Sequence, residues 1–167
     1  MSEKELLTKK FILVGMNDAM ISTEEKTIIG THALSTCIGV LLYDEAKKIA
    51  IVAHVVPDKI DAIDKIFAII IKHKLWSTKF KYKIIPGYYS EHYNTIGLIE
   101  KHLKDYTPFF EEEIPTNAIR KDDKSESCAF AFDASTGTFV TDKVYLGLDY
   151  YKINEEDMTN SNQHIHR

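Results

Sequence analysis

The chain has few of the sequence features that identify several large classes of protein. Its 167 residues include only two cysteines, seven glycines, four prolines and one tryptophan. Two cysteines are too few for a disulfide framework. The longest apolar run, residues 66–71, is far shorter than the ~20 residues of a membrane-spanning helix. The N-terminal residues lack the apolar core of a secretory signal, and the absence of a Gly-rich phosphate loop argues against nucleotide chemistry.

A surplus of one charge is also missing. Lysine and arginine number 21 against 25 aspartates and glutamates, for a formal net charge of -4. A nucleic-acid-binding domain usually carries a basic surplus on one face. The basic stretch 72–83 is interleaved with aromatic residues, as a single-strand-binding patch would be, but the polar end of a helix before a half-buried strand gives the same pattern and is favoured. We therefore expect no nucleic-acid partner, no membrane insertion and a cytoplasmic location, where thiols stay reduced.

The hydrophobic content predicts a single folded domain. Hydrophobic residues make up 44% of the sequence, and a chain of this length can bury a core without metal or disulfides. We expect one domain over residues 1–153. The remaining residues, 154–167, contain few large apolar side chains and are expected to form a flexible tail.

Apolar spacing and turn residues predict an α+β fold, in which a mostly antiparallel, sandwich-like sheet is covered by two helices. Strands are expected at 11–14, 34–42, 49–56, 81–85, 128–132, 138–140 and 144–151. One helix is expected to begin with Asp58 as N-cap and to end near residue 75, and the other to span 94–104. Polar loops are expected at 17–26 and 116–127.

Cys37 and His54 form the candidate catalytic pair. A hairpin of strands 34–42 and 49–56 would bring them to the same end of the sheet. An imidazole can hold a cysteine sulfur as thiolate, the reactive species. Backbone N–H groups in the turn at Ser35 and Thr36 could form an oxyanion hole. Taken singly, an apolar-strand Cys or His is more often a core residue, so spacing alone leaves the catalytic and structural interpretations about even.

Together with Thr31, this pair resembles the Thr/Cys/His set of the CheD chemoreceptor glutamine deamidases. The segment Leu34-Ser-Thr-Cys37-Ile is similar to the family's Leu-Gly-Ser-Cys-Val, and His54-Val-Val-Pro is similar to its His-x-x-Leu-Pro. A weaker similarity places Ile85-Pro-Gly where the family has Phe-Gly-Gly, and extends to the hairpin over 128–140.

The resemblance implies a protein-glutamine deamidase of CheD-like fold. Cys37 would be the nucleophile, His54 the base and Thr31 the group that orients the imidazole. The backbone N–H of Cys37, with a neighbour in the Ser35–Thr36 turn, would bind the oxyanion.

Three further residues, His32, Pro86 and Gly87, are candidate contacts to a substrate or partner. The resemblance also implies a protein substrate that presents a glutamine, a CheC-type or other regulatory partner, and neither cofactor nor metal. The sequence departs from the family at Ala33 and Ser35 or their neighbours, which replace loop glycines.

Two alternatives stay open. The first is a catalytically inactive CheD-like binding module in chemotaxis or signalling, in which Cys37 and His54 are packing residues. The second is a toxin-like effector deamidase acting on a host protein, because a similar Cys–His layout occurs in the cytotoxic necrotizing factors.

Cys128 is expected in the core. His32 is either a second imidazole at the mouth of the site or, as favoured, a solvated loop residue.

Overall fold

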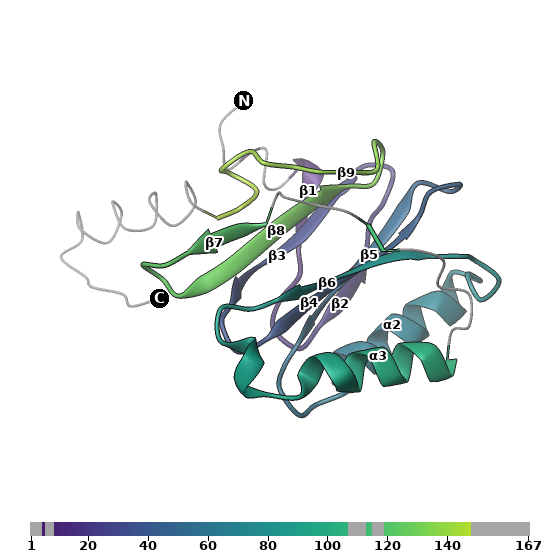
Figure 1. Ribbon diagram of the computed structural model, residues 1–167. Coiled ribbons are helices and arrows are strands. Elements are labelled where there is room, and N and C mark those ends of the chain that lie inside the picture. The colour runs from purple at the N-terminus through teal and green to yellow at the C-terminus, as the bar shows by residue number, and fades with distance from the viewer. Residues whose placement is uncertain (1–4, 6–8, 107–112, 115–118, 148–167) are drawn as a thin grey trace.

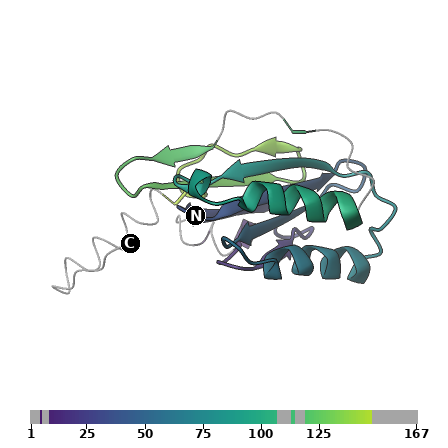
Figure 2. The same ribbon diagram turned by 60° about the horizontal axis from the view of Figure 1, so that its bottom comes forward.

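The computed structural model describes residues 5, 9–106, 113–114 and 119–147. Within these residues, nine strands and two α-helices form two packed sheets, and both helices cover the outer face of one of them (Figures 1 and 2). The predicted α+β class, with a sandwich-like arrangement of mostly antiparallel strands and two covering helices, is confirmed. No helix in the described ranges is both long and apolar enough to cross a bilayer.

The two sheets are assembled from segments distant in sequence. In the described part of the chain one sheet has five strands, ordered β1-β3-β8-β7 with β9 paired to β8: β1 (Phe11–Leu13), β3 (Ile28–Leu34), β7 (Arg120–Asp122), β8 (Ser127–Asp133) and β9 (Thr138–Phe139). The other has four, ordered β2-β5-β4-β6: β2 (Ala19–Ile21), β4 (Ile38–Asp44), β5 (Ile49–Val55) and β6 (Lys81–Pro86). Only β1 and β3 pair in parallel among these strands.

Strands β4 and β5 are buried on both faces, which explains their almost uninterrupted apolar sequence. Successive side chains of a strand point to opposite faces. Leu41 and Tyr43 therefore enter the layer between the sheets. Val40 and Leu42 face the layer under the helices. This second layer is completed by α2 (Asp61–Lys72) and α3 (Thr95–Tyr106), whose buried side chains include Ile63, Ile66, Ile70, Ile99 and Leu103.

The region before Cys37 differs from the expectation. Strand β3 occupies residues 28–34, of which the expected strand included only residue 34, so the expected strand 34–42 is the end of β3, a bend at 35–37 and then β4. Strand β2 lies inside the expected loop 17–26 and pairs with β5 through Ala19 and Ile21. Both expectations were wrong because these short segments gain their burial from neighbouring strands rather than from an alternating pattern of their own.

Other boundaries also differ. Asp58 has a φ of 60° and does not cap α2, which begins at Asp61 without a side-chain cap and ends at Lys72. Strand β7 interrupts the expected loop 116–127, and residues 143–147 are turns rather than a strand. Residues 148–151 of that expected strand and the expected tail 154–167 lie outside the described residues.

Candidate functional site

The β4–β5 hairpin places Cys37 and His54 at the same end of the four-stranded sheet. Gly39 is the direct partner of His54 across the two strands. Directly opposed residues share a face, and so do residues two apart along a strand. Cys37, immediately before β4, belongs to the apolar cluster between the sheets. Cys37 and His54 are therefore both directed into the layer between the two sheets.

Thr31 reaches His54 from the opposite sheet. It lies in β3 and is fully buried, with its Oγ1 2.8 Å from His54 Nδ1. The same hydroxyl donates to the carbonyl oxygen of Val14 at 2.8 Å. A hydroxyl has one hydrogen to donate, so it must accept from the imidazole. His54 consequently carries its proton on Nδ1, and its Nε2 is the unprotonated nitrogen.

The free nitrogen of His54 has no hydrogen-bond partner in the described part of the chain, although it is buried. Burial also lowers the pKa of His54 to about 4, because a charged imidazole is poorly solvated between the sheets. At neutral pH the ring is therefore neutral. An unpaired buried acceptor in a native fold requires an explanation, and a proton-accepting role would supply one.

Burial favours the neutral thiol form of Cys37. Only 5% of the residue is exposed. Burial raises the pKa of the Cys37 thiol, an effect that a side-chain hydrogen bond with Thr36 opposes more weakly. Burial disfavours the charged forms of both groups and so opposes a resting thiolate held by imidazolium.

The bend at residues 35–37 leaves two amides available. The N–H of Ser35 donates to the carbonyl of Ala33 at 3.1 Å. Within the described residues, the N–H groups of Thr36 and Cys37 donate to no carbonyl. Of the amides expected to stabilise an oxyanion, those of Thr36 and Cys37 are therefore free to do so, whereas that of Ser35 is occupied.

A β-bulge at Ala33 sets the orientation of β3. Thr31 pairs with Phe130 and Leu34 with Cys128, so one extra residue lies on β3 between these pairs. Ala33 has a φ of 58°, a left-handed conformation that costs a non-glycine residue about 1–2 kcal/mol. The bulge allows both Thr31 and Leu34 to face the layer between the sheets. Ala33 thus adopts a positive φ although it is not glycine.

His32 does not belong to this site. It follows Thr31 in a strand and faces the other side of the sheet, where its ring lies 5.9 Å from that of Phe11. It is 7% exposed, and its Nε2–H donates to the carbonyl of Tyr145 at 2.7 Å. Both interpretations of His32, a second imidazole at the mouth of the site and a solvated loop residue, were wrong because residues 28–34 form a strand.

The other sequence candidates lie nearby. Pro86 is exposed at the end of β6, opposite Ile38. Gly87 is buried, and a Cβ built on it would lie 2.3 Å from the carbonyl oxygen of Cys37. Gly87 is therefore a packing partner of the cysteine loop. Cys128 is buried in the layer between the sheets, which confirms its expected core position.

Two tyrosines that the sequence analysis did not select also lie at this end. Tyr88 and Tyr89 follow Gly87 and donate through their backbone N–H groups to the carbonyls of Leu34 and Ser35. The adjacent pair of aromatic residues after Pro-Gly was the only signal in the sequence. It did not reveal their neighbours, which depend on how the two sheets pack.

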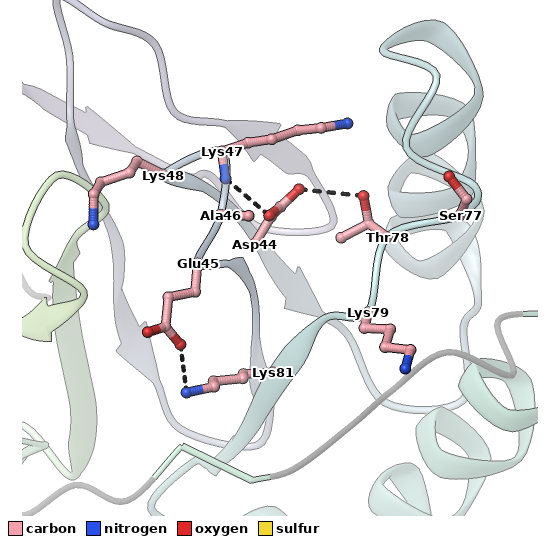
Figure 3. A pocket seen from close by; sticks show the side chains of 9 residues that line it. All are labelled: Asp44, Glu45, Ala46, Lys47, Lys48, Ser77, Thr78, Lys79 and Lys81. Carbon is pink, nitrogen blue, oxygen red and sulfur yellow. Dashed lines mark hydrogen bonds and ion pairs between the residues drawn. The ribbon is translucent and has the colours of Figure 1, made fainter.

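A pocket at the opposite end of β4 contains none of these residues (Figure 3). It is lined by residues 44–48, 77–79 and 81. Glu45 pairs with Lys81, and Asp44 accepts a hydrogen bond from Thr78. The side chains of Lys47, Lys48 and Lys79 point in different directions (Figure 3). This pocket therefore lacks a set of polar groups that converge on one ligand.

Neither metal ligands nor matches to known proteins give further information on the site. Within the described ranges, no group of three or more His, Cys, Asp or Glu residues is placed to hold a metal ion. Comparison of the chain with models of known protein families and with curated proteins found no match.

Proposed function

We propose that this protein is a cysteine-dependent protein-glutamine deamidase. The observation that carries the proposal is the hydrogen bond between Thr31 and His54. It fixes the imidazole tautomer and leaves Nε2 as the free base, on a residue that faces the same layer between the sheets as Cys37. Maintaining a buried nitrogen without a partner costs about 1–3 kcal/mol, and a role in proton transfer accounts for it.

The residues support a two-stage acyl transfer. The Cys37 thiol gives its proton to His54 Nε2 as the sulfur bonds to the glutamine side-chain carbon. The tetrahedral oxyanion would accept hydrogen bonds from the free N–H groups of Thr36 and Cys37. Its collapse breaks the C–N bond, and the imidazolium returns the proton to the departing ammonia. Water, deprotonated by His54, then attacks the thioester, and glutamate and the thiol are released.

The starting protonation state differs from that of a preformed ion pair. Since burial keeps both thiol and imidazole neutral, proton transfer would accompany the attack of Cys37 rather than precede it. The neutral imidazole is available as a base over the whole range above pH about 4.

The resemblance to the CheD deamidases supplies the substrate class of this proposal. It favours a glutamine on a protein, a cytoplasmic reaction and a CheC-type or other regulatory partner. A toxin-like effector would use the same chemistry on a host protein, so ammonia release and the mass change of an amide becoming an acid would identify the target in either case.

The reaction of Cys37 with an alkylating agent tests the proposal directly. The rate would be measured against pH in the parent and in His54→Ala. Both proteins would also carry Cys128→Ala, so that Cys37 is the only thiol that can react. General-base assistance contributes roughly 10²- to 10⁴-fold, so we expect His54→Ala to slow the reaction toward the rate of an unassisted thiol. Identical pH profiles in the two proteins would overturn the proposal.

A catalytically inactive binding module is the second candidate, and the burial of Cys37 favours it. A reactive cysteine is usually partly exposed and has a lowered pKa, whereas Cys37 is 5% exposed and burial raises its pKa. For a structural thiol, the alkylation rate should follow global unfolding and should not depend on which residue occupies position 54.

A further inference from the structure

The segment that leaves β6 lies directly on the cysteine loop. The N–H of Tyr88 donates to the carbonyl of Leu34 at 3.0 Å, and that of Tyr89 donates to the carbonyl of Ser35 at 2.7 Å. A Cβ on Gly87 would come within 2.3 Å of the carbonyl oxygen of Cys37 and 2.6 Å of that of Ser35. Only glycine permits this approach, so residues 87–89 lie as close to the loop as backbone atoms can.

The two tyrosine side chains continue to the opposite sheet. Tyr88 Oη donates to Asp123 Oδ1 at 2.8 Å, and Tyr89 Oη donates to Glu126 Oε2. Both carboxylates belong to the turn between β7 and β8. The Nζ of Lys121, in β7, lies 5.1 Å from the centre of the Tyr88 ring. The end of β6 and the β7–β8 turn lie at the same end of the sandwich in Figures 1 and 2.

These side-chain ties close the layer that contains Cys37. The Tyr88 ring packs against the apolar cluster formed by the two sheets, which includes Cys37 and Cys128. The Asp123 carboxylate raises the pKa of Tyr88 to about 12, as expected for a phenol that donates to an anion. The ties thus join the four-stranded sheet to the five-stranded sheet over the end where Cys37 lies.

The two phenol–carboxylate hydrogen bonds can be broken without disturbing either sheet. Both phenol–carboxylate bonds are exposed, so water can take the place of each partner at small net cost. Cys37, by contrast, is 5% exposed, so little of the residue is open to a carboxamide in this arrangement. Access to Cys37 therefore needs a local movement of the chain. Such a movement would cost the least free energy where it breaks the two exposed phenol–carboxylate bonds.

From these contacts we infer that residues 87–92 form a strap that gates Cys37, held shut by its two backbone bonds to the cysteine loop and by the bonds of Tyr88 to Asp123 and of Tyr89 to Glu126. The inference rests on the proposed function, since a glutamine has to reach Cys37. A substrate protein would displace the two phenols from their carboxylates, and opening would be completed when the backbone bonds of Tyr88 and Tyr89 to the cysteine loop break.

The alkylation rate of Cys37 measures strap opening. In the Cys128→Ala chain, the double variant Tyr88→Phe/Tyr89→Phe loses both phenol bonds and keeps both rings. We expect it to react roughly 5- to 30-fold faster, which corresponds to the loss of two exposed hydrogen bonds. Tyr93→Phe is the matched control: Tyr93 is 42% exposed, and its hydroxyl has no hydrogen bond among the described residues. It should react at the parent rate and keep the parent's thermal transition, whereas the double variant should lose only the few degrees that two exposed hydrogen bonds account for.

A mutant cycle identifies the carboxylates as the other half of the latch. Asp123→Ala/Glu126→Ala should accelerate alkylation as much as the tyrosine pair does, and combining the two pairs should add nothing further. A tyrosine variant that reacts at the parent rate, or two effects that multiply, would overturn the strap.

The strap and the proposed function can fail separately. If the strap variants leave the rate unchanged but His54→Ala still slows it, the strap is wrong and the base stands. If the strap variants react faster to the same degree with His54 or Ala at position 54, and position 54 itself has no effect, the strap stands and the deamidase fails.

Discussion

A single buried hydroxyl determines which nitrogen of His54 can act as a base. Thr31 has one hydrogen and gives it to the carbonyl of Val14, so its lone pair receives the Nδ1–H of His54. The hydroxyl is placed by β3, whereas His54 is placed by β5 in the other sheet. The chemistry of the imidazole therefore depends on a contact between layers, which the neighbours of His54 in sequence do not reveal.

Replacement of Thr31 by the nearly isosteric valine tests this dependence. In Thr31→Val, the His54 Nδ1–H and the Val14 carbonyl both lose their buried partner, which we expect to cost about 1–3 kcal/mol of unfolding free energy. The imidazole would also no longer be restricted to one tautomer. Nitrogen NMR of His54 reports the tautomer, and urea unfolding reports the stability.

Thr31→Ser is the matched control for this change, because it keeps the hydroxyl and removes only a methyl group. It should retain the Nδ1–H tautomer and most of the Cys37 reactivity. Persistence of the same tautomer in Thr31→Val would show that another contact positions the ring.

At the scale of elements, the hairpin and the helices could be predicted, but the strand that carries Thr31 could not. Residues 38–44 and 49–55 are apolar runs around a polar turn, and the stripes of α2 and α3 follow helical spacing. Of the residues of β3, only Leu34 was expected in a strand, because small and hydroxyl residues interrupt the apolar ones. The bulge at Ala33 then breaks the period of two on which strand prediction depends.

The close fit of Gly87 to the cysteine loop gives a prediction at this scale. In Gly87→Ala, the added methyl would meet the carbonyl oxygens of Cys37 and Ser35. Either the end of β6 or the loop must move, and overpacking of this kind costs about 1–3 kcal/mol. We expect a corresponding loss of stability in urea unfolding and a faster alkylation of Cys37 as the strap is pushed away.

Gly15→Ala provides the comparison for that variant. A Cβ at Gly15 would have no atom within 4 Å, so this substitution should leave both stability and alkylation close to those of the parent. Equal stability of Gly15→Ala and Gly87→Ala would contradict the tight packing of residue 87 against the loop.

At the scale of the whole molecule, the candidate site is a product of sheet packing. Thr31 belongs to the five-stranded sheet, His54 to the four-stranded sheet and Cys37 to the bend that leads into it, and the strap connects the ends of the two sheets. The sequence could indicate Cys37 and His54 because one hairpin holds both. It could not indicate Asp123 or Glu126, since their relation to Tyr88 and Tyr89 arises only when the layers pack. The same packing excludes water from the imidazole, which lowers the pKa of His54.

This exclusion of water makes the stability of the fold depend on pH. His54 has a pKa of about 4 when folded, against 6.5 for an ordinary histidine, so between these values the unfolded chain binds a proton that the folded chain does not. Stability is therefore complete above the unfolded value and falls as the pH drops from 6.5 toward 4, by about 3 kcal/mol from this residue. Burial lowers the pKa of His32 as well, which acts in the same direction.

Urea unfolding at roughly pH 7 and pH 4 should show a smaller loss of stability in His54→Gln than in the parent, whereas His73→Gln, at an exposed position, should lose as much as the parent. An equal loss in His54→Gln would mean that His54 can be protonated within the folded protein, and the site between the sheets would then have to admit water at rest.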